Sequence, residues 1–342
     1  LPRRPRHGPY PDRAASRNRV RHPAQKRLGE AVGERRIEGS CHQFSPGVWS
    51  HDADQDYVLH FVVEFDRPIL RVGSWKDDVV ANDIRELSSG PCKYAGLFVE
   101  FDPVRNPVVQ VRSGISLVSV ENAAQNLAAE VTEPFGWDFE AVRRNQVDTW
   151  NDLFSRLTVK TNDRLEKVRF YNNMYRAICS RNTWSDVNGQ WVSTDGKVHT
   201  VPIPRKMSYW AATHSGTRSG TSTQFWNLVT PEWSSRWVNS QLAMYDANGW
   251  LAKGPAGMNY IPVMVGEHEI PLIVSAWQMG IRRLRRQEGA RSLGQDADHP
   301  GAEGIQGLRR QPRPDRLHGH HYVPPRQGPL LEYDGILLRR LD

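Results

Sequence analysis

The stretch EPFGWDFEAVRRNQVDTWNDLFSRL, residues 133–157, contains the point at which the spacing of apolar residues along the chain changes. Before this stretch, apolar residues alternate with polar ones, which is typical of strands. Within it, the positions that follow helical spacing are Phe139, Val142, Gln146, Trp150, Leu153 and Leu157. The change near Gly136 therefore predicts a β region followed by a helical region.

The region before residue 133 has the pattern of a sheet. Residues 57–65 (YVLHFVVEF) place Tyr, Leu, Phe, Val and Phe on one face at a period of two. Residues 94–101 and 108–120 have strand-like patterns as well, and turn residues separate the segments. Several short strands without intervening helices indicate an antiparallel β-sandwich, which we assign to residues 39–132.

Three further helices are expected after the first. Residues 165–178 repeat apolar residues at helical spacing, and a third helix should begin with Thr230 as its N-cap and Pro231 at its first position. It should end near Gly249. Residues 269–280 (EIPLIVSAWQMG) are apolar on nearly all sides, which predicts a buried helix ending at Gly280. Helices joined by long aromatic connections indicate an α/α barrel with its site in the loops.

The net charge of +7 is concentrated at the two ends of the 342-residue chain. Residues 1–38 hold 11 Lys and Arg against 4 Asp and Glu, and residues 281–342 hold 12 against 8. Both ends lack Phe and Trp, so we expect them to be disordered. Residues 39–280 are net acidic, which argues against a nucleic-acid partner. The sequence contains no run of 18 apolar residues, so we expect no membrane span.

The segment WSDVNGQWVSTDGKVHT, residues 184–200, contains residue types suited to a sugar. A Trp ring offers a flat apolar face to a pyranose, and Asp and His hydrogen-bond its hydroxyl groups. The candidates are Trp184, Asp186, Trp191, Asp195, His199 and Trp250, with Glu267 and His268 as a candidate proton-transfer pair. Each has an alternative: core packing for a Trp, turn capping for Asp186 and Asp195, and helix capping for Glu267 and His268.

Three strings in order carry a resemblance to a known family. They are residues 109–130 with the GWDFEAVR that follows, residues 170–199 (FYNNMYRAICSRNTWSDVNGQWVSTDGKVH), and residues 239–281, which include LAMY and GWL. Together they resemble glycoside hydrolase family 92, the calcium-dependent exo-acting α-mannosidases.

That resemblance implies an α+β multidomain protein, with a partial N-terminal antiparallel β-sandwich followed by a partial (α/α)6 barrel. It also implies an inverting mechanism assisted by calcium, mannose-containing glycans as substrates, and a secreted or periplasmic location. Substrate binding is expected from Trp184, Asp186, Trp191, Trp250, Glu267 and His268. The expected units are a basic segment 1–38, the sandwich 39–132, a linker helix 133–160, the barrel 161–281 and a tail 282–342.

Two departures leave the catalytic residues unassigned. The family's W-D-T-F string, whose Asp binds the terminal mannose, is missing after Tyr209. The general acid lies in an E-Y-x-Y-D-D-W string that residues 330–335 (LLEYDG) match only in part, so Glu332 is a coincidental match. The catalytic base of the family lies beyond residue 342.

The genetic code offers a reason for both departures. Residues 210–223 can be encoded so that reading two bases later yields G-G-N-A-F-W-D-T-F-W-D-L-N. Residues 328–342, read one base later, can yield G-R-F-S-N-T-M-E-Y-S-Y-D-G-W, with the Glu codon straddling Gly335 and Ile336. We therefore expect residues 1–38, 210–224 and 282–342 to be out-of-frame translations, and the chain as written to be an inactive α-mannosidase fragment. The alternative is a non-catalytic carbohydrate-binding protein.

Overall fold

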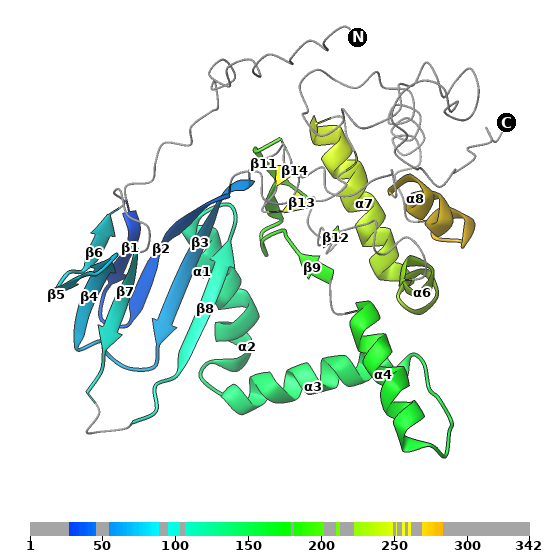
Figure 1. Ribbon diagram of the computed structural model, residues 1–342, viewed down its shortest axis with the longest axis horizontal. Coiled ribbons are helices and arrows are strands. Elements are labelled where there is room, and N and C mark those ends of the chain that lie inside the picture. Colours follow the sequence, from blue (N-terminus) through cyan, green and yellow to red (C-terminus); the bar gives the residue numbers. More distant parts are fainter. Residues whose placement is uncertain are drawn as a thin grey trace, which may run out of the picture.

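The computed structural model places two sheets at one side of the molecule and a group of helices at the other, joined by the helical residues 120–155 (Figure 1). It describes residues 27–45, 55–88, 95–102, 107–178, 181–193, 195–201, 210–212, 222–248, 251, 255–256, 259–260 and 269–282. The order of strands before helices agrees with the change of apolar spacing near Gly136.

The larger sheet has five antiparallel strands in the order β6-β1-β2-β3-β8. Its strands are β1 (Arg27–Val32), β2 (Arg36–Ser45), β3 (Gln55–Phe65), β6 (Glu86–Ser88) and β8 (Val111–Ser116). β3 is the expected strand at 57–65. The sheet starts ahead of the expected boundary at residue 39, because residues 27–38 pair in register as β1 and the first part of β2. Residues 27–38 therefore belong to the sheet.

The smaller sheet covers one face of the larger one. It has the order β5-β4-β7, formed by β4 (Arg71–Lys76), β5 (Val79–Asn82) and β7 (Ala95–Glu100). A Cβ on Gly29 of β1 would lie 2.9 Å from Leu97 of β7, so the two sheets approach closely there. The rings of Phe65 and Phe101 lie 5.1 Å apart between centroids. The expected antiparallel sandwich is present as these two sheets.

A helix covers the opposite face of the larger sheet. Residues 117–132 were expected to continue the sandwich, but α1 (Val120–Leu127), a π-helical turn (Ala128–Thr132) and α2 (Glu133–Phe135) occupy most of this range. Val62 of β3 is fully buried against Ala123 and Leu127 of α1. A Cβ on Gly114 of β8 would lie 2.2 Å from the Ala123 carbonyl oxygen, so α1 packs on β8 only because that residue is glycine.

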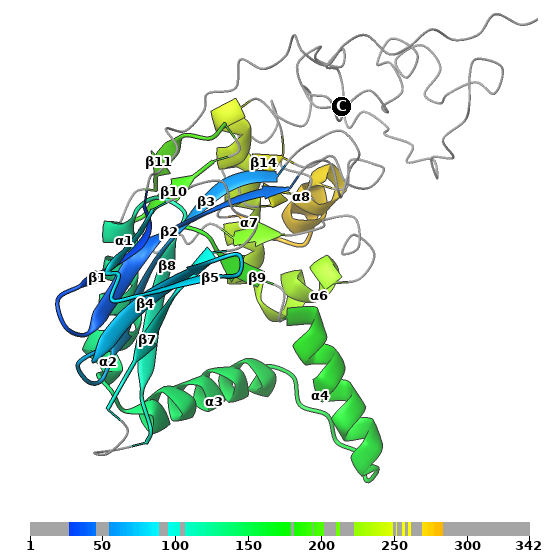
Figure 2. The ribbon, with the colours of Figure 1, turned by 60° about the vertical axis from the view of Figure 1, so that its left-hand side comes forward.

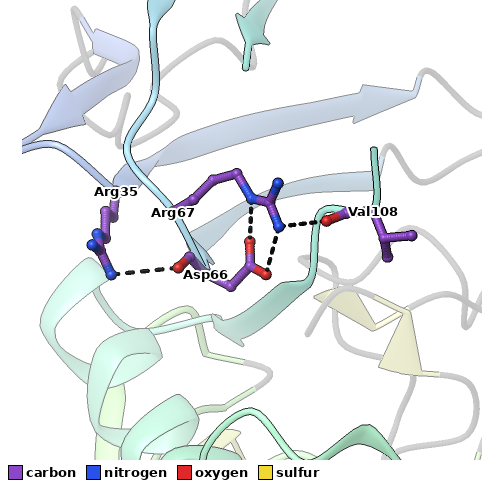
Figure 3. Close-up of polar contacts among 4 residues, drawn as sticks. All are labelled: Arg35, Asp66, Arg67 and Val108. Carbon is purple, nitrogen blue, oxygen red and sulfur yellow. Dashed lines mark hydrogen bonds and ion pairs between the residues drawn. The ribbon is translucent and has the colours of Figure 1, made fainter. Parts of the chain in front are cut away.

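An arginine–carboxylate pair holds the turn after β3 (Figure 3). Arg67 donates from Nε and Nη2 to the two carboxylate oxygens of Asp66, at 3.0 and 3.1 Å, and Nη2 also donates to the Val108 carbonyl oxygen. Arg35, in the β1–β2 turn, donates to the Asp66 carbonyl oxygen. The hydrogen bonds from Arg67 lower the pKa of the Asp66 carboxyl group, so this corner of the sandwich is held by an ionised pair.

The four helices expected from the sequence are present. They are α3 (Phe139–Ser155), α4 (Arg164–Ile178), α7 (Pro231–Asn248) and α8 (Glu269–Gln278). Pro231 is the first residue of α7 as expected, and the Thr230 carbonyl oxygen accepts from the Trp233 and Ser234 amides. The Thr230 hydroxyl donates back to Trp226 of α6 (Ser222–Val229), a helix that the spacing did not predict.

Two apolar clusters hold the helical region together. One joins α3, α4 and α6 through buried residues Leu153, Met174, Ile178 and Val229. The other joins α7 to α8, and its members include Trp237, Leu242, Leu251, Ile270 and Ile273. In both views α3 and α4 extend away from the sheets (Figure 1, Figure 2).

Short strands interrupt the region that we expected to be mainly helical. They are β9 (Arg181–Thr183), β10 (Gln190–Val192), β11 (Val198–Thr200), β12 (Trp210–Ala212), β13 (Pro255–Ala256) and β14 (Asn259–Tyr260). β12 and the start of α6 fall inside 210–224. The described helices α4, α6, α7 and α8 pack against one another, and the partial (α/α)6 barrel stays a prediction. None of the described helices is long and apolar enough to cross a membrane.

Candidate functional site

The segment expected to face a sugar folds as a small hairpin. β10 and β11 pair antiparallel, with Trp191 opposite His199. Gly189 and Gly196 adopt φ values of +82° and +75°, which glycine tolerates without strain, and each closes a turn by donating its amide to a carbonyl three residues earlier. Figure 2 shows β10 and β11 beside the end of α1. The glycines of the motif thus bring its polar residues together at the junction of sandwich and helices.

Trp191 faces the protein interior. Only 2% of its surface is exposed, and it packs with Val201 and with Met244 of α7. Trp184 lies against the same cluster but is only partly buried. The position of Trp191 therefore agrees with the core-packing alternative. Trp184 keeps an exposed portion that is available to a ligand.

Asp186 is buried at the start of the hairpin segment, with 7% of its surface exposed. Its Oδ2 accepts from Ser116 Oγ at 2.8 Å and from Asn122 Nδ2 at 2.7 Å, and its Oδ1 accepts from Asn126 Nδ2 at 2.7 Å. The Asp186 amide donates to the Gln190 carbonyl oxygen. The expected sugar ligand is therefore engaged by three side chains of the protein itself.

Asp195 and His199 form the second polar pair of the hairpin. His199 Nε2 lies 3.1 and 3.0 Å from the two Asp195 carboxylate oxygens, and both side chains are partly exposed. Asp195 Oδ1 also accepts from the Lys197 amide, so it caps the turn as the alternative proposed. A carboxylate at one ring nitrogen orients the imidazole, which leaves Nδ1 as the nitrogen that could meet a sugar hydroxyl group.

Two ionisable groups, His60 and Glu130, lie close enough to Asp186 to interact with it. Burial lowers the pKa of His60 on β3, while the negative charges of Glu121 and Asp186 oppose that shift. The pKa of Glu130 is raised, first by desolvation of its carboxyl group and then by Asp186, although much of the residue is exposed. The junction beneath α1 is therefore a polar, charged environment inside an otherwise apolar contact.

His60 makes this junction sensitive to pH. Its pKa is lower in the folded chain than its ordinary value of about 6.5, so the unfolded chain binds the proton more readily. The free energy of unfolding is therefore unaffected by His60 protonation above pH 6.5, and it falls as the pH drops below that value and the unfolded chain takes up the proton. In urea unfolding between pH 5 and 7.5 we expect His60→Gln to reduce the pH slope of the unfolding free energy, by at most about 1.4 kcal/mol per pH unit. An unchanged slope would contradict this.

The structure describes three of the six expected substrate-binding residues. It brings Trp184, Asp186 and Trp191 into one hairpin, while Trp250, Glu267 and His268 lie outside the described residues. The partners of Asp186 were not singled out from the sequence. The available signal was Asn122 and Asn126, two amide side chains four residues apart on one face of α1.

The resemblance implies a calcium ion, but the described residues contain no cluster of carboxylates suited to bind it. Among the described residues no group of three or more His, Cys, Asp and Glu side chains could hold a metal ion. The Asp186 carboxylate faces amide and hydroxyl donors, an arrangement that stabilises an anion without a cation. The described residues thus do not fit a calcium site.

The comparisons with known proteins first indicate a class, the catalytic domains of glycoside hydrolases. The family model described as the glycosyl hydrolase family 92 catalytic domain matches residues 122–333. Because this match covers more than half of the chain, the chain belongs to glycosyl hydrolase family 92. No curated protein sequence matches it.

Solved structures of the same family share the fold. The inverting mannosidase BT2199 from Bacteroides thetaiotaomicron VPI-5482 is 20% identical over 88% of this chain, with a TM-score of 0.72. The α-mannosidase BT3965 from Bacteroides thetaiotaomicron is 18% identical over 80% of this chain, with a TM-score of 0.66, and was also solved in complex with mannoimidazole. This chain spans only 39% and 36% of the lengths of those two proteins.

Proposed function

We propose that this chain is part of an inverting exo-α-mannosidase that removes terminal mannose from glycans, and that it is inactive as written. The match to the family 92 catalytic domain over residues 122–333 carries the proposal. Mannosidases among its structural neighbours, one of them solved with mannoimidazole, support mannose as the sugar. A secreted or periplasmic location is part of the same proposal, because mannose-rich glycans lie outside the cytoplasm.

We infer inactivity because the carboxylates that the reaction needs are missing from the chain as written. An inverting glycosidase uses one carboxylic acid to protonate the leaving oxygen and one carboxylate to activate a water on the opposite face of the sugar. The W-D-T-F Asp is replaced by residues 214–219 (HSGTRS), and the expected acid string is scrambled. Neither Asp186 nor Asp195 supplies this pair, because each carboxylate is held by groups of its own segment or of α1 and β8.

A partial sugar surface is supported by the hairpin. We assign direct contact to the exposed portion of Trp184 and to Nδ1 of His199, which Asp195 orients. Trp250, Glu267 and His268 are candidates for the same surface on the strength of the sequence. Trp191 belongs to this surface as its support from behind, through its packing under the hairpin.

A non-catalytic carbohydrate-binding protein is the second candidate. The observation in its favour is that the hairpin keeps its aromatic and polar residues while the catalytic strings are missing. This candidate predicts mannose binding without release of product, whatever the frame of residues 210–224. Because both candidates predict that the chain as written releases no product, they are separated by hydrolysis in a chain restored to the alternative frames and full length, and not by binding.

Isothermal titration calorimetry of the full chain with mannose tests the sugar surface. We expect weak binding, with a Kd in the millimolar range, about 4 kcal/mol of binding free energy. His199→Ala should weaken it by about 2–10-fold through loss of one hydrogen bond. Val198→Ala, at an exposed position next to it, is the matched control and should bind normally. Absence of mannose binding, or an equal response to galactose, would contradict the proposal.

A further inference from the structure

We propose that Asp186 is a positioning residue: its carboxylate fastens the hairpin of residues 184–201 to α1 and to the end of β8. The sequence made it a candidate sugar ligand. Its burial and its three partners, two on α1 and one on β8, assign it a different task.

The carboxylate is already provided with donors. Ser116 Oγ, Asn122 Nδ2 and Asn126 Nδ2 donate to it at 2.7 to 2.8 Å. An ionised carboxylate offers about four lone-pair positions, so three donors leave little capacity for a sugar hydroxyl group. Hydrogen bonds to a charged acceptor are stronger than neutral ones, which makes this an effective attachment.

The two asparagines also bind the hairpin segment elsewhere, so the attachment is reciprocal. Asn126 Oδ1 accepts from the Val187 amide at 2.9 Å, and Asn122 Nδ2 donates to Gln190 Oε1 at 2.9 Å. Asn188 Nδ2 donates to Asn122 Oδ1 at 3.1 Å. Val187, Asn188 and Gln190 are thus tied to α1 as Asp186 is, and the strands that carry Trp191 and His199 follow directly.

The arrangement connects the two parts of the fold. α1 packs on the sandwich, whereas the hairpin packs on Met244 of α7 through Trp191. Asp186 lies between them, so the position of the hairpin relative to the sandwich depends on its carboxylate. The relevance of this to sugar binding rests on the proposed function, but the attachment itself does not.

Asp186→Asn in the full chain tests the attachment. The substitution keeps the shape but turns one acceptor into a donor that faces the donors of Asn122 or Asn126. We expect the Tm to fall by about 5 °C or more, and hydrogen exchange of the Val187 amide to accelerate by at least about 10-fold. Asp148→Asn on α3 removes a charge of the same kind at an exposed position and should change neither. An unchanged Tm and Val187 exchange rate in Asp186→Asn would overturn the proposal.

The reciprocal exchange Asn122→Asp with Asp186→Asn tests the pairing itself. It keeps one negative charge in the cluster and restores a donor opposite an acceptor, and Gln190 can turn its amide to donate to the new carboxylate. We expect the double variant to recover at least half of the lost Tm and the protection of Val187, whereas Asn122→Asp alone should be the least stable. No recovery would mean that the loss does not arise from this pairing, which would also overturn the proposal.

A mannose titration of the same variants separates this inference from the proposed function. If mannose binds to none of the chains, the sugar surface is wrong, while the exchange data still decide the attachment. If Asp186→Asn abolishes mannose binding but leaves Val187 protected and the Tm unchanged, then Asp186 is a sugar ligand and not a positioning residue.

Discussion

An aryl α-mannoside incubated with the 342-residue chain and calcium is expected to be hydrolysed at least about 10⁴-fold more slowly than by a rebuilt chain. The rebuilt chain restores residues 210–223 and 328–342 to the alternative frames and extends the protein to the length of its structural relatives. Loss of general acid or base assistance costs about 10²–10⁴-fold for each group. Here both groups are affected, and two losses of about 10²-fold multiply to about 10⁴-fold. Loss of the Asp that positions the sugar adds to this, so about 10⁴-fold is a minimum.

The control is a rebuilt chain in which the recovered Glu, encoded across Gly335 and Ile336, is replaced by Gln. Its turnover should fall by about 10²–10⁴-fold relative to the rebuilt chain, because the leaving oxygen is then not protonated. Comparable turnover from the chain as written and the rebuilt chain would show that the catalytic carboxylates lie elsewhere, with Glu267 as the first candidate. In that case the frame argument is wrong.

Replacement of Trp191 by Ala should lower the free energy of unfolding by about 3–5 kcal/mol, the range typical of a buried Trp. The ring is 2% exposed and packs on Val201 and Met244, so its removal leaves a cavity between the hairpin and α7. Chemical denaturation measures the change. Trp191→Phe, which fills part of the cavity, should cost less.

Val198→Ala on the facing strand is the matched control for this prediction. Val198 is 51% exposed, and its truncation should change the free energy of unfolding by no more than about 0.5 kcal/mol. A sugar-stacking Trp would behave in the opposite way, because its loss would remove mannose binding and leave stability nearly unchanged. That result for Trp191→Ala would show that the ring faces the ligand.

The helices that were predicted correctly carry a clear local signal. α3 and α4 repeat apolar residues at helical spacing, Thr230 and Pro231 mark the start of α7, and α8 is apolar on nearly all sides. α1 was missed because residues 117–120 continue the apolar pattern of β8, although Ser119 caps the helix by accepting from the Asn122 amide and Val62 packs against its buried face. β1 was missed because its Arg-rich surroundings show no apolar alternation, and pairing with β2 forms the strand.

The sequence by itself determined the family, the order of sheet before helices and the polar and aromatic residue types of segment 184–200, because these can be read from the chain without its tertiary structure. Only the tertiary structure decided what Asp186 and Trp191 do within that motif. The donors to Asp186 lie between 60 and 70 positions away, on β8 and α1. The sequence around Asp186 does not distinguish a carboxylate that faces water from a carboxylate that is enclosed by three donors. Folding alone brings the donors to it, and their hydrogen bonds make it part of the framework.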